Sequence, residues 1–231
     1  MATEALLDRF YAILGALEQR GQGQTLGSYS GRSGLPKRGV YFFREPGELR
    51  RDGSTPRIVR VGTHGLAEGA KSTLWGRLRT HAGTRSGGGN HRGSIFRLHV
   101  GAALLAREDC SLPSWGSGST RPTEVRSNPA LLAAEAGIER AVSAYICSMS
   151  ILWVAVPDEP GASSQRGYIE RNAIALLSNR FDPLDPPSAG WLGHHSARSE
   201  IRRSGLWNFN HVDEACDPSF LDALEGMAEG T

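Results

Sequence analysis

Two strand patterns joined by a turn constrain the fold of this chain more than any other feature. RGVYFFRE (38–45) is a short apolar and aromatic run, and RIVRVGT (57–63) forms a second strand pattern. β-Branched and aromatic residues of this kind favour strands. Between the two runs, Asp52-Gly53 is a strong turn signal. The stretch therefore predicts an antiparallel hairpin, and MSILWVAVPD (149–158) predicts a further buried strand.

Helical patterns flank these strands. Six segments carry apolar residues at helical spacing: 4–20, 71–82, 94–108, 131–147, 167–179 and 218–228. In the first, the apolar face is Leu6, Phe10, Ile13, Leu14 and Leu17; in the fifth it is Ile169, Ala173, Leu176 and Leu177. The predicted inward face of the third, which Ser94 caps, holds Ile95, Leu98, Ala102 and Leu105. Segments rich in glycine, serine and proline predict loops at 21–37, 83–93, 111–128 and 182–191.

Composition excludes several classes of protein. No run of about 18 apolar residues occurs, so a membrane span is not expected. The N-terminus lacks the basic start, apolar run and cleavage site of a signal peptide. Cys110, Cys147 and Cys216 are odd in number and far apart, which argues against a disulfide framework. We therefore expect a protein of a reducing compartment, the cytoplasm.

The basic residues are uneven in kind. The net charge is only +2, yet of 26 basic residues only Lys37 and Lys71 are lysine. Arginine grips two phosphate oxygens at once, which would suit phosphate recognition. A GC-rich genome, which favours arginine codons, explains the same bias, so both interpretations stay open.

Five short motifs occur in a telling order along the chain. They are Gly39-Val40-Tyr41, Val61-Gly62, the pair Arg77 and His81, Glu170, and an Asn beyond it. In this order and context the chain resembles the GIY-YIG nuclease superfamily, over roughly residues 38–82 and 149–180. The resemblance implies an α+β fold with a small antiparallel three-stranded sheet flanked by helices. It also implies three parts: an N-terminal helical extension (1–37), a nuclease core (38–180) with a helical insertion (84–148), and a C-terminal extension (181–231).

The resemblance also implies a chemistry for the motif residues. Glu170 would be the metal ligand, and one carboxylate with waters and phosphate oxygens suits Mg²⁺ or Mn²⁺. Arg77 and His81, four residues apart, project from one face of a helix. Arg77 would stabilise the charge on the scissile phosphate, and His81 would hold the attacking water or the Tyr41 hydroxyl. By the same resemblance Tyr41 acts as general base or positions that water, with its pKa lowered by cations or the metal.

Two positions depart from the family pattern or leave it undecided. Arg60 stands where the family usually has the Tyr of its second motif, so a two-tyrosine mechanism is in doubt. A cation there could hold Tyr41 as phenolate or bind phosphate. We prefer Asn179 as the closing Asn because it ends the predicted Glu170 helix, while Asn208 and Asn210 remain alternatives.

Further residues are candidates for nucleic-acid contact. Gly62 would leave room for close backbone approach. A mobile glycine loop carries His91, Arg92 and Arg97 just before a predicted helix N-terminus, which favours anions. The segment 194–211 interleaves cations, including Arg202 and Arg203, with aromatic residues such as Trp207. The alternatives are a plain flexible loop and a docked tail whose Trp207 lies in the core.

Two metal-site alternatives come from the C-terminal part of the chain. A zinc site is conceivable from His194, His195, His211 and Cys216. NFNH (208–211) is weakly similar to an HNH nuclease motif, but no paired metal-binding elements accompany it.

Three functional hypotheses follow. The first is a metal-dependent DNA endonuclease with a restriction-like or defence role, for which cutting both strands requires a homodimer or two encounters. An adjacent methyltransferase gene would favour restriction, and its absence would favour repair or a mobile-element role. The second is a nucleic-acid-binding module of the same fold, catalytically weak or inactive. The third is a small metal-dependent hydrolase of another class.

Overall fold

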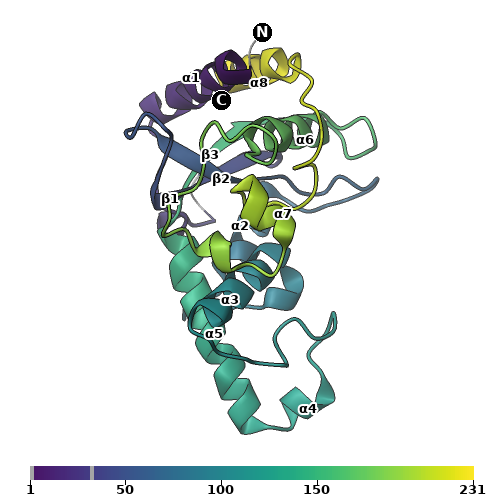
Figure 1. Cartoon of the computed structure of the whole chain (residues 1–231). Helices are drawn as coiled ribbons and strands as arrows, with labels where there is room; N and C mark the ends of the chain where they lie inside the picture. Colours follow the sequence, from purple (N-terminus) through teal and green to yellow (C-terminus); the bar gives the residue numbers. More distant parts are fainter. Residues whose placement is uncertain (1–2, 32–33) are drawn as a thin grey trace.

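A three-stranded antiparallel sheet forms the centre of the molecule. The computed structural model describes residues 3–31 and 34–231. In the sheet, β1 (Gly39–Leu49) lies between β2 (Pro56–Gly62) and β3 (Ser150–Ala155) and is antiparallel to both (Figure 1). The predicted hairpin, the third strand and the α+β class are therefore confirmed.

Alternation along β1 divides the core into two layers. Successive side chains of a strand point to opposite faces, so Val40 and Phe42 lie in one apolar cluster and Tyr41 and Phe43 in the other. The register places Tyr41 opposite Gly62 of β2. Tyr41 thus points to the face of the sheet on which the candidate site lies.

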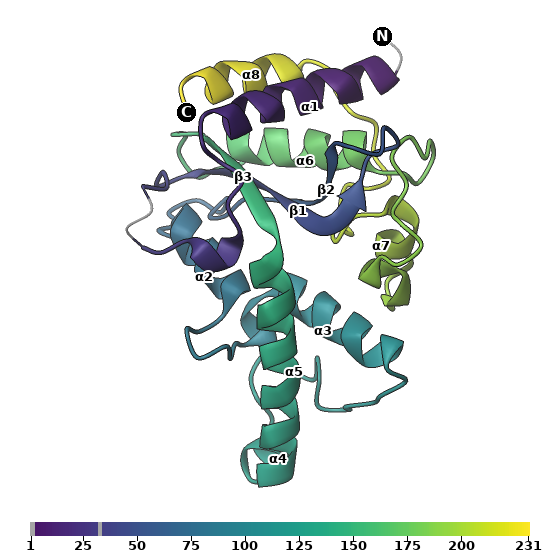
Figure 2. The ribbon, with the colours of Figure 1, turned by 90° about the vertical axis from the view of Figure 1, so that its left-hand side faces the viewer.

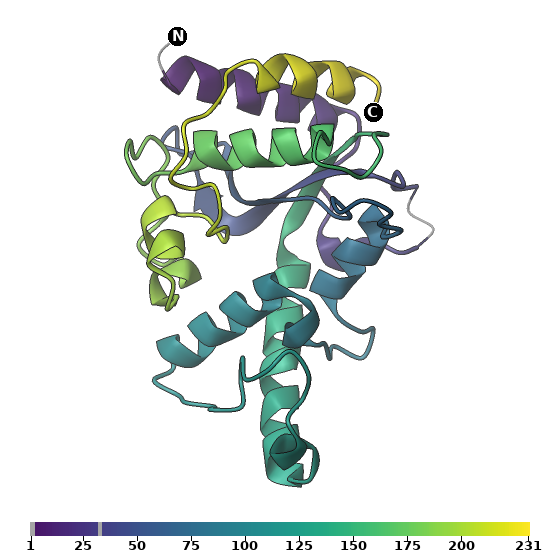
Figure 3. The same ribbon diagram turned by 90° about the vertical axis from the view of Figure 1, so that its right-hand side faces the viewer.

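Three helices cover the first face of the sheet. They are α1 (Thr3–Gln19), α6 (Gln165–Leu177) and α8 (Phe220–Glu229) (Figure 2). The apolar stripes predicted for the helices at 4–20 and 167–179 are buried, as expected. Helices α1 and α8, from the two ends of the chain, lie side by side (Figure 3), and Arg9 of α1 pairs with Asp222 of α8. Both terminal helices therefore pack into the same hydrophobic core as the sheet. The boundaries of the three predicted parts of the chain remain a prediction.

The second face carries α2 (Leu74–Ala82), α3 (Ile95–Arg107) and α5 (Pro129–Ser148). Thr73 and Ser94 cap α2 and α3: each side chain accepts a hydrogen bond from a backbone N–H of the first turn. Shorter elements complete this side: η1 (Leu26–Ser28), η2 (His91–Gly93), α4 (Thr123–Arg126), η3 (Leu192–His195) and α7 (Ser199–Ser204). Helix α4 and the first half of α5 project from the body as an arm (Figures 1 and 3).

The inward face predicted for α3 is wrong by one position. Ile95 is exposed, and the buried face runs through Phe96, Val100 and Ala103. The physical reason is the larger side chain next in sequence: Phe96 packs edge to face against Phe43 of the sheet, with ring centroids 5.4 Å apart.

The outer edge of β2 is covered by the C-terminal segment. The backbone N–H of Trp207 donates to the carbonyl of Val59 at 2.7 Å. The side chain of Asn208 accepts from the N–H of Val61 at 3.0 Å and donates to its carbonyl at 2.9 Å. These bonds satisfy an edge that would otherwise be open to pairing. Among residues 3–31 and 34–231, no helix is long and apolar enough to cross a lipid bilayer.

Candidate active site

A buried phenol and imidazole form the centre of the site. The Tyr41 hydroxyl lies 2.9 Å from Nε2 of His81, and the other ring nitrogen of His81 lies 2.8 Å from the Ser94 hydroxyl. Burial, followed by the charges of Arg60, Arg77 and Arg97, holds the pKa of His81 well below its usual value. The imidazole is therefore neutral and has a hydrogen-bond partner at each nitrogen.

Arg60 occupies the place beside this phenol. Its Nη1 donates to the Trp207 carbonyl at 2.9 Å, and its guanidinium lies 4.6 Å from the centre of the Phe96 ring. Burial lowers the pKa of Arg60, and the neighbouring Tyr41 and Glu170 oppose that shift. The guanidinium remains charged because arginine does not deprotonate in proteins. A cation thus stands next to Tyr41, where the family pattern has a second phenol.

Arg77 and Glu170 line one cavity of about 430 Å³. Oε1 of Glu170 accepts from the backbone N–H of Thr63 at 3.2 Å. Burial raises the pKa of Glu170, while Arg60, the Thr63 N–H, His211 and Arg77 act in the opposite direction. The carboxylate therefore faces both guanidinium groups. The structure brings together all five of Tyr41, Arg60, Arg77, His81 and Glu170.

Two arginine nitrogens at this site lack a protein partner. In the part of the chain that the structure describes, Nε of Arg60 and Nε of Arg77 are buried without a hydrogen bond. A buried donor left unpaired costs about 1–3 kcal/mol, more when charged. An anion in the cavity would satisfy such donors, and a phosphate carries the acceptor oxygens that arginine binds best.

The donor set suits a hard divalent cation held by one carboxylate. Across the described ranges, no group of three or more His, Cys, Asp or Glu side chains is placed to hold a metal. The zinc alternative therefore has no support: His194 bonds the Ser188 carbonyl, and His211 bonds Glu214. Glu170 alone would leave most of the coordination of Mg²⁺ or Mn²⁺ to waters and phosphate oxygens, as Mg²⁺ prefers.

Asn208, and not Asn179, lies next to these residues. Asn179 is buried at the far end of α6, where its amide donates to the Ser204 carbonyl and accepts from the Asp185 N–H. Helix α6 ends at Leu177, seven residues and about 10 Å along the helix axis from Glu170, and Asn179 lies two residues beyond that end. Asn208 instead brackets Val61, between Arg60 and Gly62. The preference for Asn179 stays a prediction, although it is Asn208 that lies beside Arg60 and Gly62.

The residues expected to grip DNA from the glycine loop are buried in an ion network. Arg97 is fully buried and pairs with Glu139, which also accepts from His91 at 2.9 Å. The Arg92 side chain is 3% exposed and pairs with Glu135 at 2.8 Å. These carboxylates lie on α5, so the His91 ring and the two arginines tie the loop and α3 to that helix. Their polar groups already have partners inside the protein, and their contact with DNA stays a prediction that this burial speaks against.

The C-terminal candidates divide into core and surface. Trp207 is fully buried, and its indole N–H donates to Glu45, as does that of Trp191. Arg202 and Arg203 are exposed on α7 and remain candidates for phosphate contact. Gly62 is buried beneath the Tyr41 ring, and its close approach to DNA stays a prediction that this covering ring speaks against.

Two participants were missed from the sequence. His64 lines the same cavity as Arg77 and Glu170, but its only signal in the sequence is its position just after the second strand. The second is the Trp207 carbonyl, which accepts from Arg60. Every residue has a backbone carbonyl, so the residue type gives no signal for it. Only the folded C-terminal segment brings it to the site.

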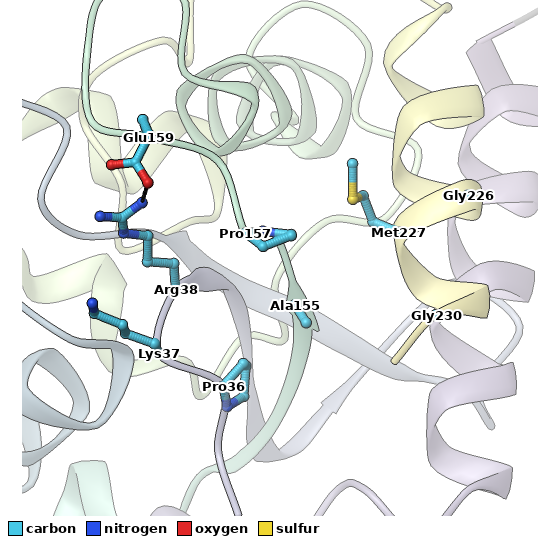
Figure 4. Close-up of a pocket in the computed structure, with 9 residues that line it drawn as sticks. All are labelled: Pro36, Lys37, Arg38, Ala155, Pro157, Glu159, Gly226, Met227 and Gly230. Atoms are coloured by element: carbon cyan, nitrogen blue, oxygen red, sulfur yellow. Dashed lines mark ion pairs between the residues drawn. The ribbon is translucent and has the colours of Figure 1, made fainter.

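A second cavity, of about 460 Å³, has a different lining (Figure 4). Its walls include Pro36, Ala155 and Met227, and its charged pair, Arg38 and Glu159, is joined at 2.8 Å. The phenol, the imidazoles and Glu170 are not among its lining residues. The candidate active site is therefore the cavity of Arg77 and Glu170.

Comparison with known proteins agrees with the geometry. A family model described as GIY-YIG domain matches residues 1–231. No curated protein and no solved structure matches the chain.

Proposed function

This chain belongs to the GIY-YIG domain family, and from that premise we propose that it is a metal-dependent endonuclease that hydrolyses DNA phosphodiester bonds. Family membership supports a nuclease-type function in general. The observation that carries the more specific proposal is the cavity lined by Arg77 and Glu170, with Tyr41, Arg60 and His81 clustered in the protein interior beside it.

Arg77 is proposed to bind the scissile phosphate. It lines the cavity, and its Nε is a buried donor without a partner among the described residues. Charge on the phosphoryl oxygens rises as the water attacks, so a preorganised guanidinium stabilises the transition state more than the ground state. Arg60, with its own unpartnered Nε, would add a second positive charge from the sheet side.

Tyr41 and His81 are proposed to manage the proton of the attacking water. The neutral imidazole can hold the Tyr41 hydroxyl in one orientation through the 2.9 Å contact. The adjacent Arg60 would favour any negative charge that develops on the phenol oxygen. Arg60 would thus stabilise the Tyr41 oxygen by its positive charge, where a second tyrosine would do so by a hydrogen bond from its hydroxyl.

Glu170 is proposed to hold Mg²⁺ or Mn²⁺. When bound, such an ion would neutralise the phosphate and make its water more nucleophilic. Because Arg60 and Arg77 face the same carboxylate, the site without DNA carries more positive than negative charge. We therefore expect the ion to bind much more tightly when a phosphate is present.

A restriction-like or defence role remains a proposal about the biology. The projecting arm of α4 and α5 and the C-terminal segment enlarge the core, as recognition elements would. Cutting both strands in that role requires a homodimer or two encounters, and a methyltransferase partner is expected of a restriction system. The alternative is a module of the same fold that binds nucleic acid without cutting it. Arg60, in place of the second tyrosine, is the observation that favours this alternative.

Nicking of supercoiled plasmid tests the proposal. The wild-type chain should nick DNA with Mg²⁺ or Mn²⁺, and Glu170→Ala should lower the rate at least about 100-fold, the scale of losing a transition-state charge contact. Glu159→Ala is the matched control, because Glu159 is an exposed carboxylate of the other cavity. Unchanged cutting by Glu170→Ala would overturn the metal assignment. A chain that binds DNA but never cuts it with either ion would be the binding module.

A further inference from the structure

His64 is an imidazole inside the active-site cavity that the motif residues leave unused. It is 5% exposed, lies in the loop between β2 and α2, and lines the cavity with Arg77 and Glu170. Its Nε2 is buried and has no hydrogen-bond partner among residues 3–31 and 34–231. Buried polar atoms nearly always have a partner, so this nitrogen calls for one that is not part of the protein.

The loop holds His64 rigidly in this place. Arg166, fully buried at the start of α6, donates to the His64 carbonyl and pairs with Asp158. The next residue, Gly65, has a φ of +58°, and a β-carbon there would lie 2.6 Å from the Ser72 hydroxyl. These contacts hold the backbone that carries the imidazole.

Ser72 lies against one ring nitrogen of His64. Nδ1 of His64 is 3.4 Å from the Ser72 hydroxyl, and the Ser72 backbone acts to raise the pKa of His64. A backbone carbonyl can only accept, so this neighbour favours hydrogen on the nitrogen that faces Ser72 and a lone pair on Nε2. Burial and the charges of Arg166, Arg38 and Arg77 lower the pKa of His64 to about 4. The ring is therefore neutral near pH 7, and Nε2 keeps its lone pair.

A lone pair on Nε2 of His64 can accept a hydrogen bond only from a group that carries a hydrogen. The non-bridging oxygens of a phosphodiester carry no hydrogen and cannot donate to it. A water molecule can donate, and hydrolysis at a one-carboxylate magnesium site requires several waters. With hydrogen on Nδ1, water is therefore the ligand in a hydrolytic cavity that fits Nε2.

We propose that His64 is a water-positioning residue of this active site, whose Nε2 accepts a hydrogen bond from a water molecule in the cavity shared with Glu170 and Arg77. The proposal deepens the nuclease function proposed above and rests on it. A hydrogen bond to Nε2 would fix the orientation of the water. Its oxygen lone pair would then point more consistently at the phosphorus atom, without His64 taking up a proton.

The first test reads the tautomer and needs no activity. Long-range ¹H–¹⁵N NMR of the ¹⁵N-histidine-labelled full chain at pH 7 distinguishes a protonated nitrogen from one with a lone pair. We expect His64 to show hydrogen on Nδ1 and none on Nε2, with assignment from the loss of its signals in His64→Gln. A hydrogen on Nε2 would overturn the proposal, because the unpartnered nitrogen would then be a donor.

The second test compares kinetics of three variants. His64→Phe removes the acceptor and keeps a flat ring, and its kcat for plasmid nicking should fall roughly tenfold or more with the DNA Kd changed less than about threefold. His64→Gln restores an acceptor oxygen near the place of Nε2 and should recover part of that loss. His99→Phe is the matched control: His99 is also buried with an unpartnered Nε2, but it does not line the cavity.

The outcomes separate the two proposals. Full activity in His64→Phe, or equal losses in His64→Phe, His64→Gln and His99→Phe, would show that His64 has only a structural role. If the wild-type chain does not cut DNA at all, the proposed function fails. The NMR result still decides whether Nε2 is an acceptor in that case.

Discussion

The Tyr41 ring lies directly over the α-carbon of Gly62, its partner on the neighbouring strand. A β-carbon at Gly62 would come within 2.3 Å of the Tyr41 hydroxyl oxygen and 2.4 Å of the ring carbon that bears it. Contacts this short do not occur between unbonded atoms, so any side chain here must displace the phenol. Gly62 is thus required by Tyr41 itself, and the motif glycine and the motif tyrosine form one unit.

Gly62→Ala should consequently abolish the site while leaving much of the sheet intact. Displacing Tyr41 breaks its 2.9 Å contact with His81, and overpacking of this kind costs about 1–3 kcal/mol. We expect nicking to fall at least about 100-fold, because catalytic groups tolerate little misplacement. Plasmid nicking and urea unfolding measure the two effects.

Gly137→Ala is the control for this change. Gly137 lies in α5, and a β-carbon there meets nothing within 4 Å. An alanine in a helix interior stabilises by about 0.5–1 kcal/mol relative to glycine. If Gly62→Ala behaved like Gly137→Ala, with full activity and a small gain in stability, the close packing of Tyr41 on Gly62 would not be catalytically important.

A second prediction separates the two asparagines. Asn208→Ala removes both hydrogen bonds to Val61, so the strand between Arg60 and Gly62 should loosen and kcat should fall about tenfold or more. Asn179→Ala should cost about 1–3 kcal/mol of stability, because it leaves the buried N–H of Asp185 without its acceptor, while the Ser204 carbonyl keeps the backbone N–H of residue 179. Its kcat, measured well below the melting temperature, should stay near wild type. The reverse pattern would restore Asn179 to the site.

These asparagines show where sequence patterns stop being informative. The strands, most helices, the caps and the order of the motif residues follow from local periodicity and turn chemistry, which the sequence carries directly. Asn179 and Asn208 have identical chemistry, and only tertiary packing decides which one reaches β2. Local order is therefore predictable from the chain, whereas the return of a distant segment is not.

The same limit explains the arginines of the glycine loop. A mobile basic loop before a helix is a sound pattern for anion binding, but the pattern does not show where Glu135 and Glu139 lie. These carboxylates come from α5, more than forty residues later, and neutralise Arg92 and Arg97. His64 differs from these arginines because no pattern pointed to it: a single histidine in a loop carries no periodic signal.

A third prediction concerns acid stability. The pKa values of His64 and His99 are lowered to about 4, and that of His81 is also lowered, mainly by burial. Between their ordinary value of 6.5 and these lowered values, the unfolded chain binds more protons than the folded chain. The free energy of unfolding should therefore fall as pH drops from about 6.5 toward 4, by at most about 1.4 kcal/mol per pH unit for each group.

The raised carboxylates act in the opposite direction. The pKa values of Glu45 and Glu170 lie above 4.5, so these groups favour the folded state as pH falls. We expect the three histidines to outweigh them between pH 6.5 and 5. Urea unfolding at pH 7.5, 6.5, 5.5 and 5.0 (about one-unit steps across the window set by linkage) measures the slope. His99→Phe should make it shallower, and an identical slope in that variant would contradict the buried neutral state of His99.

A fourth prediction concerns the buried ion pair of Arg97. Its guanidinium donates to Glu139 at 3.0 Å and to the His81 carbonyl at 2.8 Å. Arg97→Met removes the arginine that pairs with Glu139 and leaves the His91 ring as the other side chain described beside that carboxylate, so unfolding should cost about 3–5 kcal/mol less. Thermal unfolding measures this loss. A stable variant whose only defect is weaker DNA binding would instead return Arg97 to the list of DNA contacts.

The last prediction concerns Arg202 and Arg203, which α7 holds at the surface. If they contact DNA phosphates, each substitution to alanine should weaken binding by a similar factor on all sequences. Each should also lower the slope of log K against log salt by about one, because one fewer counterion is released. Fluorescence anisotropy at 50–200 mM salt, about the range over which such contacts dominate, measures that slope. Arg107→Ala is the control, since Arg107 is also an exposed arginine near a helix end but is paired with Glu108 on α3. Equal slopes for the wild type and all three variants would place the DNA path elsewhere on the molecule. A reduced slope for Arg202→Ala and Arg203→Ala alone would place the bound DNA along the C-terminal segment, which also holds Trp207 and Asn208 against β2.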